Sequence, residues 1–243
     1  MEKEMKSQAA FGRETKRSAF FSAPRLQCLF VLLLLLAVSS CAPRYVGTPS
    51  YKGVSLDEAL AAMKKISTID AVLAVEYEKG DGGGMSGDAH LTVTQEKLDL
   101  RIYYLGFLAG EVSEEGGIIK SKPRLDRNKG TLLVDGLRNS LFWWEISDYA
   151  VSERDNLYVL KNSFREVAID RETLLPVRQT IELENGDRLE ISYESPARVE
   201  KEETAEGGES VTDAYEPLWY QSEMNIAYRG HTVKVRVKSY STL

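Results

Sequence analysis

The chain has 243 residues, carries 31 Lys+Arg against 37 Asp+Glu for a formal net charge of −6, and is 43% hydrophobic. This acidic balance disfavours nucleic acid as a partner, and we expect none. With only two cysteines and two histidines, the chain has little material for disulfides, thiolate chemistry or a metal centre.

The first 40 residues are predicted to be a lipoprotein signal peptide. Six basic and three acidic residues precede an apolar run of 13 residues from Leu26 to Val38. That run is shorter than the ~20 residues a helix needs to cross a bilayer, so a transmembrane anchor is the weaker interpretation. The end of the run, Val38-Ser39-Ser40-Cys41, resembles the bacterial lipobox, which implies cleavage before Cys41 and acylation of its thiol, for example by palmitate. The alternative is an ordinary signal peptide cleaved near a cysteine.

Cleavage at that point leaves 203 residues with 25 Lys+Arg and 34 Asp+Glu, enough for one domain with a sizeable core. Cys28 leaves with the signal and Cys41 carries the lipid, so the folded body holds no cysteine. Residues 41–54 contain several prolines and glycines without an apolar period, which predicts a lipid-anchored tether. Residues 55–243 are then expected to form a single β-barrel domain.

A capping box, Ser55 with Glu58, predicts a helix at the start of this domain. From Ile69 the apolar period changes to two, which is typical of strands. About eleven strands are predicted, over residues 69–77, 89–93, 98–104, 109–113, 118–122, 157–160, 164–169, 177–183, 189–193, 219–228 and 233–237. A second one-sided helix is predicted from Leu132 to Trp144.

Residues 195–217 interrupt this pattern with the acidic stretch from Glu200 to Glu209, which predicts a solvated, mobile loop. In the last strand, Lys234, Arg236 and Lys238 all fall on the outward face. We interpret this basic stripe as a solvated face that discourages edge pairing, in preference to a binding surface.

The segment Leu105–Leu108 breaks the inside–outside alternation of the preceding strand and contains Gly106. Two interpretations are open. Leu105, Phe107 and Leu108 project as a membrane-contacting loop, or the segment is a bulge or turn packed on its own sheet.

The sequence contains no motif of a zinc protease, a serine hydrolase, a phosphate-binding loop or a dinucleotide fold. His90 alternates outward, His231 falls in a turn, and Asp170 is expected to form a turn, not to act as a catalytic acid. We therefore predict no catalytic residue, no cofactor and no metal site, and a protein that is not an enzyme.

The order of these elements resembles the LolA/LolB-like lipoprotein-localisation fold. The resemblance is carried by the lipobox Cys41, the capped helix before the first strand, Leu100-Arg101-Ile102 leading into Leu105-Gly106, and the strand–turn–proline–strand pattern of residues 165–194. It implies a mainly β fold with flanking helices (α+β), built as a curved, incompletely closed antiparallel barrel with a helical lid over an apolar cavity. The chain departs from the family at Tyr104, where a proline is expected, and in its acidic insertion.

The resemblance also implies a function in which the barrel binds acyl chains of lipoproteins or another lipid. The chain would then take part in lipoprotein or lipid delivery to the outer membrane, where Cys41 anchors it facing the periplasm. A periplasmic carrier protein is a further expected partner. Ala42, in place of an aspartate retention signal, favours the outer membrane. Candidate cavity-lining residues are Leu100, Ile102, Tyr104, Leu137, Leu141, Trp144, Ile181 and Ile191. The alternative is a structural or assembly lipoprotein whose solid barrel binds a protein partner.

Overall fold

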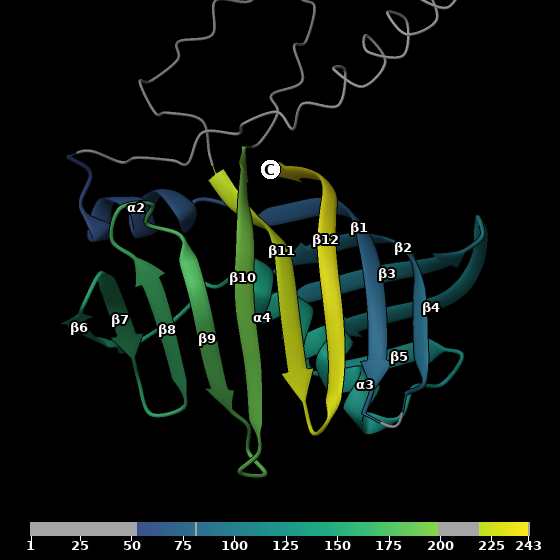
Figure 1. The fold of residues 1–243 in the computed structure, drawn as a ribbon. Helices are drawn as coiled ribbons and strands as arrows, with labels where there is room; N and C mark the ends of the chain where they lie inside the picture. Colours follow the sequence, from purple (N-terminus) through teal and green to yellow (C-terminus); the bar gives the residue numbers. More distant parts are fainter. Residues whose placement is uncertain (1–52, 81, 199–218, 243) are drawn as a thin grey trace, which may run out of the picture. The chain divides into compact units, whose positions relative to one another are not determined.

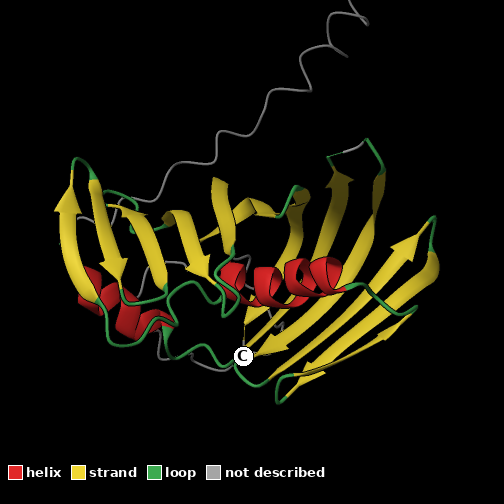
Figure 2. Cartoon of the chain, turned by 90° about the horizontal axis from the view of Figure 1, so that it is seen from below, coloured by secondary structure: helices red, strands yellow, loops and turns green. Residues whose placement is uncertain are grey.

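The computed structural model describes residues 53–80, 82–198 and 219–242, which belong to one compact unit, 46–243. Twelve strands form one antiparallel sheet in the order β5-β4-β3-β2-β1-β12-β11-β10-β9-β8-β7-β6 (Figure 1). The end strands β5 and β6 do not pair with each other, so the sheet is open. Figure 2 shows the sheet curving around a central helix. The predicted incompletely closed barrel with a helical lid is confirmed, whereas the signal, Cys41 and most of the tether lie outside the described residues.

The strands are β1 (Thr68–Lys79), β2 (Gly84–Thr94), β3 (Lys97–Tyr104), β4 (Phe107–Glu115), β5 (Ile118–Lys122), β6 (Ala150–Arg154), β7 (Leu157–Lys161), β8 (Arg165–Asp170), β9 (Pro176–Glu182), β10 (Arg188–Arg198), β11 (Trp219–Tyr228) and β12 (His231–Thr242). The helical segments are α2 (Leu56–Met63), α3 (Arg127–Thr131), the π-helical turn η2 (Leu132–Gly136) and α4 (Leu137–Leu141).

The capping box predicted for the first helix is present at α2. Ser55 Oγ accepts a hydrogen bond from the Glu58 backbone N–H at 3.3 Å, and Glu58 Oε2 accepts one from the Ser55 N–H at 2.8 Å. These two bonds satisfy N–H groups that a helix start leaves without partners. Leu56, Leu60 and Met63 form the buried face of α2, as their spacing predicts.

The second helix lies where the sequence places it, but its ends differ. It begins at Arg127, where Asp126 Oδ1 caps the Lys129 N–H at 3.0 Å, and not at Leu132. It ends at Leu141 instead of Trp144, because Phe142 leaves the helical conformation with φ −99° and ψ 49°. We call the continuous segment α3–η2–α4, residues 127–141, the lid helix.

Two further expectations need correction. The twelfth strand, β6, was not predicted because all five of its residues are exposed, so its sequence carries no apolar alternation. The predicted loop 195–217 starts too early, because β10 continues through Arg198 with Ser195 in a left-handed conformation at φ 59°. The rest of that loop lies outside the described residues.

The sheet has an apolar concave face and a polar convex face. In β1, Ile69, Ala71 and Leu73 are fully buried, whereas the residues between them face outward and are polar or exposed. β1 also joins the two halves of the sheet, because it pairs with β2 on one side and with the C-terminal strand β12 on the other. The core therefore lies on the concave face, under the lid helix (Figure 2).

Candidate functional site

The lid helix covers the concave face with apolar side chains. Leu132, Val134 and Leu137 are at most 1% exposed, and the π-helical turn contacts strands β10, β11 and β12. Short π-helical turns inside helices are rare and are frequent at functional sites. The lid helix is thus a separate layer whose apolar side chains pack on the apolar face of the sheet.

Gly136 brings the lid helix unusually close to β11. A Cβ at residue 136 would lie 2.7 Å from Cγ2 of Ile226 and 3.8 Å from its Cβ. Real Cβ atoms do not approach other carbons to 2.7 Å, so glycine at this position sets how deeply the lid helix seats. The absence of a side chain matters here for space, since Gly136 has an ordinary helical φ of −61°.

Arg165, at the start of β8, holds the segment that directly follows the lid helix, residues 142–145. Its guanidinium donates to the backbone carbonyls of Glu145 at 2.6 Å, Trp143 at 3.2 Å and Phe142 at 3.3 Å. The guanidinium also donates to the Asn139 carbonyl in the last turn of the lid helix at 3.4 Å. The last carbonyls of a helix lack partners within it and carry partial negative charge, so a cation there is favourable.

Arg165 is held in turn by Gln179 of β9, whose Oε1 accepts from Arg165 Nε and Nη2. Burial lowers the pKa of the Arg165 guanidinium, but arginine stays protonated at neutral pH. The buried positive charge is therefore stabilised by neutral oxygens of the lid and the sheet. We call this set of contacts the Arg165 latch.

A second polar contact ties the lid helix to β4. Arg138 of α4 forms an ion pair with Glu114, which is almost fully buried and also accepts from the Gly117 N–H at 2.7 Å. Burial raises the pKa of the nearby Asp135 carboxyl, and Glu114 raises it further, while Arg138 opposes both effects. The lid helix thus has polar ties toward β4 and β8, and a third toward β12, where Asn128 Nδ2 lies 3.3 Å from His231 Nε2.

Most of the predicted cavity-lining residues lie in the packed core: Leu100, Leu137, Leu141, Trp144, Ile181 and Ile191 are buried, and Ile102 is partly buried against them. Tyr104 is a correction, because it is 56% exposed. β3 runs beyond the core at this point, and Tyr104 pairs with Phe107 in the protruding β3–β4 hairpin. Between α2, α4 and strands β10–β12 the interior holds a space of about 20 Å³. That volume is enough for about one water molecule, far from the several hundred Å³ of a typical ligand pocket.

The β3–β4 hairpin carries the predicted membrane-contacting residues at its tip. Leu105 is 80% exposed and Phe107 78% exposed, and Leu108 is also exposed. Leu105 and Gly106 both have positive φ, at 51° and 82°, as in a hairpin turn that favours asparagine and glycine. A leucine in the left-handed region is strained, and Leu105 gains no burial in return. Uncompensated strain of this kind is more frequent at functional sites than elsewhere.

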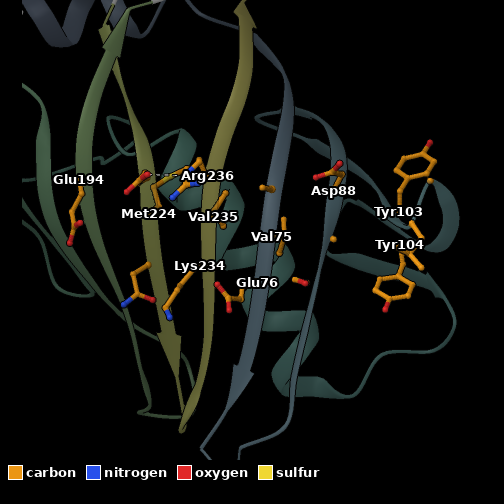
Figure 3. Close-up of a pocket in the computed structure, with 17 residues that line it drawn as sticks. Val75, Glu76, Asp88, Tyr103, Tyr104, Glu194, Met224, Lys234, Val235 and Arg236 are labelled. Atoms are coloured by element: carbon orange, nitrogen blue, oxygen red, sulfur yellow. Dashed lines mark hydrogen bonds and ion pairs between the residues drawn. The ribbon is translucent and has the colours of Figure 1, made fainter. Parts of the chain in front are cut away.

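The convex face also bears a groove of about 700 Å³, over strands β1–β3 and β10–β12 (Figure 3). Three basic side chains in or beside the groove pair with acidic neighbours on the same face. Lys234 binds Glu78 at 2.9 Å and Arg236 binds Glu223 at 2.8 Å, while Lys238 beside the groove binds Asp88 at 2.6 Å. The stripe is therefore a solvated face, as interpreted, but it does not protect a sheet edge, because β12 is a central strand that pairs with β1 and β11.

Asp170 is a turn former, as expected. Its Oδ1 accepts from the backbone N–H groups of Glu172 and Thr173 and from the Thr173 hydroxyl. His90 faces outward and lies 3.1 Å from Asp70 Oδ1. Among the described residues, no group of three or more potential metal ligands comes together. Within the same residues, no helix is both long enough and apolar enough to cross a membrane.

Sequence reasoning missed Gly136, Arg165, Gln179 and Glu114. A signal existed for three of them, because each is a polar residue in phase with buried neighbours: Arg165 with Val167, Gln179 with Ile181, and Glu114 with Val112. For Gly136 the sequence contains no such signal, because a glycine in a helical pattern does not indicate which strand will pack against it.

No protein-family model matches the chain, and no curated protein sequence matches it. Among solved structures, it is similar to a DUF1329 family protein from Desulfovibrio piger, with 10% identity and a TM-score of 0.45 over 81% of this chain and 94% of that one. It is also similar to a LolA superfamily protein from Nitrosomonas europaea, with 10% identity and a TM-score of 0.49 over 78% and 94% of the two chains. A domain described as an outer membrane lipoprotein-sorting protein, from Vibrio parahaemolyticus, has 9% identity and a TM-score of 0.46 over 79% and 92%. One of these three structures is described as a LolA superfamily protein, and LolA is one of the two proteins that name the fold the sequence resembles.

Proposed function

We propose that this chain is a lipoprotein, anchored to the outer membrane through Cys41 and facing the periplasm, that binds acyl chains between the concave face of its sheet and the lid helix. It takes part there in the delivery of lipoproteins or lipid. One observation carries the proposal: an apolar concave face is covered by an apolar helix that polar contacts tie to the sheet, among them the Arg165 latch, the Glu114–Arg138 pair and the Asn128–His231 contact.

Acyl chains can replace the lid helix with little net change in free energy. The lid buries Leu132, Leu137 and Leu141 against the sheet. An acyl chain offers apolar area of the same kind, and the hydrophobic effect is roughly proportional to the area removed from water. Exchange between the membrane and the sheet therefore requires no cofactor and no catalytic residue. The closed interior is too small for an acyl chain, so binding requires the lid helix to move.

The hairpin tip is the proposed contact with the membrane. Leu105, Phe107 and Leu108 place exposed apolar side chains together at the end of β3 and the start of β4. Such side chains gain free energy when they enter the acyl region of a bilayer. The tip would thus bring the open barrel to the surface from which chains leave or into which they pass.

An engineered disulfide tests the proposal directly. Because a Cβ at residue 136 would lie 3.8 Å from Ile226 Cβ, Gly136→Cys with Ile226→Cys matches the Cβ separation of a disulfide, also about 3.8 Å. Cys28→Ser and Cys41→Ser in both samples remove other thiols and the chain's own lipid. We expect the reduced protein to bind a fluorescent fatty acid and the oxidised protein, with its lid fixed, to bind none. Equal binding by both forms would contradict the role of the lid helix.

A second candidate is a structural or assembly lipoprotein whose barrel is a solid scaffold for a protein partner. The filled interior, with a space of about 20 Å³ between the lid and β10–β12, favours this alternative. It predicts that neither the reduced nor the oxidised disulfide variant binds the fatty acid. The same experiment therefore separates the two candidates.

A further inference from the structure

The small space between α2, α4 and strands β10–β12 is bordered by apolar and aromatic side chains from all three regions. Ile66 follows α2, Leu141 ends α4, and Tyr240 lies on β12. Three residues that border it also carry polar groups: Trp144, Tyr193 and Gln221. The space thus lies at the junction of the lid helix, the first helix and the centre of the sheet.

The three polar residues share an unusual property. Trp144 Nε1, the Tyr193 hydroxyl oxygen and Gln221 Oε1 are buried and have no hydrogen-bond partner among the described residues, where Arg138 Nε is the one other such side-chain atom. Their side chains are 4%, 6% and 9% exposed. Buried polar atoms in native proteins almost always have partners. Three unpartnered atoms around one space indicate a group that this chain does not itself supply.

The donor and acceptor roles of these atoms are fixed by their surroundings. Gln221 Nε2 donates to the Pro176 carbonyl at 2.8 Å, so its Oε1 is the free acceptor. The Trp144 ring is held edge-on by Phe142 and Trp143, with ring centres 5.5 and 5.7 Å away. Burial raises the pKa of Tyr193, so its hydroxyl stays protonated and can donate. The residues that border the space therefore supply two free donors and one free amide acceptor, and the Tyr193 hydroxyl oxygen can accept as well.

We propose that this space is the polar subsite for the head of an acyl ligand, and that it selects a neutral head whose oxygen accepts two hydrogen bonds and which donates one. An amide and an alcohol have this chemistry. An ester lacks the donated hydrogen, and a carboxylate would bring an unpaired charge against Gln221 Oε1. The subsite rests on the proposed function, because the space admits a head group only when the lid helix, residues 127–141, moves; Trp144 lies beyond the end of that helix.

Four probes of equal chain length test the selection: decanamide, decanol, methyl decanoate and decanoate. Binding to the purified full-length chain is followed by tryptophan fluorescence, since Trp143 and Trp144 border the space. We expect decanamide and decanol to bind about three- to ten-fold more tightly than methyl decanoate, the value of one hydrogen bond, and decanoate to bind less tightly than either.

Variants test whether Tyr193 and Gln221 cause the differences in affinity among the probes. Tyr193→Phe should weaken decanamide and methyl decanoate alike, by about three- to ten-fold, because both lose a donor to the carbonyl. Gln221→Met should abolish the difference between the amide and the ester. Tyr228→Phe is the matched control, since this buried hydroxyl bonds to Asp187 at 3.1 Å and does not border the space, and we expect no change in affinity.

The experiment distinguishes failure of the proposed subsite from failure of the proposed function. If all four probes bind equally well and Tyr193→Phe changes nothing, the space holds a structural water only and the subsite is wrong, while acyl binding stands. If none of the probes binds, the subsite and the proposed function are both wrong. Tyr193→Phe removes one unpartnered oxygen, so the variant is expected to fold and keeps the test valid even if Gln221→Met does not.

Discussion

One oxygen of Gln179 accepts two hydrogen bonds from the guanidinium of Arg165: Oε1 accepts from Nε at 3.2 Å and from Nη2 at 2.8 Å. The amide group of Gln179 also donates to the Asn139 carbonyl in the lid helix at 3.3 Å. The two side chains on neighbouring strands thus form one unit that binds the end of the lid. The packing of the lid helix on the sheet consequently includes hydrogen bonds to a buried cation as well as apolar contacts.

Replacing the cation should loosen the lid and destabilise the domain. Arg165→Met keeps much of the side-chain volume but leaves Gln179 Oε1 and several carbonyls without a donor, which we expect to cost about 3 kcal/mol. Chemical denaturation measures this change. Arg171→Met is the matched control, because Arg171 forms an exposed ion pair with Glu153 and its loss should change stability by less than about 0.5 kcal/mol. Similar values for the two variants would contradict the Arg165 latch.

Two glycines in the lid helix should respond to alanine with opposite signs. Gly136→Ala places a methyl group 2.7 Å from Ile226 Cγ2, which should destabilise the domain by about 1–3 kcal/mol. Gly130→Ala meets only the end of Ile119 at 4.0 Å, so its better helix propensity should stabilise by up to about 1 kcal/mol. Thermal melts of the two variants test this; a stabilising Gly136→Ala would show that the lid does not seat against β11.

Two leucines with the same backbone conformation allow strain and packing to be separated. Leu105 and Leu174 both have φ 51°, but Leu105 is exposed and Leu174 is buried. Leu105→Asn should stabilise by about 0.5–1 kcal/mol, because asparagine tolerates the left-handed region. Leu174→Asn should instead destabilise by about 2 kcal/mol or more through lost burial. Both are measured by denaturation, and destabilisation by Leu105→Asn would contradict uncompensated strain at the tip.

The double change Leu105→Glu with Phe107→Glu tests what the tip is for. Both side chains are more than three-quarters exposed, so stability should change by less than about 0.5 kcal/mol per site. Binding to phospholipid vesicles, measured by co-sedimentation, should fall strongly because the apolar contact is lost. Val151→Glu, at an exposed apolar position on β6, serves as the control and should leave vesicle binding intact. Unchanged binding by the double variant would remove the tip from the proposed mechanism.

The carboxyl group of Asp135 should lower the free energy of unfolding of the domain as pH rises. Burial raises the pKa of its carboxyl in the folded state, with a further increase from Glu114 and a decrease from Arg138. Because the folded pKa lies above the unfolded value of about 4, the stability contribution is complete below that pH and is lost as pH rises through the folded pKa. Asp135→Asn should therefore raise stability at neutral pH and flatten its pH dependence above about pH 4. Denaturation of both proteins at a series of pH values tests this, and identical slopes would contradict it.

Cys41→Ala should release the chain from the membrane, because the predicted lipidation needs this thiol. Cell fractionation measures the release, and mass spectrometry of the wild-type protein should find acyl groups on a chain that begins at Cys41. A variant that stays in the membrane as an uncleaved precursor would show that residues 1–40 are an anchor. A wild-type protein without acyl groups would contradict the lipobox.

Local chemistry in the sequence predicted much of this fold. The Ser55–Glu58 capping box and eleven of the twelve strands were predictable, because caps and two-residue alternation depend on neighbours in the chain. β6 was not predictable, since its five exposed residues alternate with nothing buried. The exposure of Leu105 and Phe107 was one of two open interpretations, because a break in alternation indicates equally a bulge and a projecting turn.

Tertiary structure decided the arrangement that the proposed function uses. The pairing of β1 with β12 joins residues such as Val75 and Val235, which no local periodicity connects. The close contact of Gly136 with Ile226 depends on which strand passes which turn of the helix, and the hydrogen bonds from Arg165 depend on where the segment after the helix meets β8. The period of the sequence determined which side chains of most strands face inward, but it was wrong at Tyr104, where β3 extends beyond the core. Only the folded chain determined which inward-facing groups meet, because that depends on contacts between segments far apart in the chain.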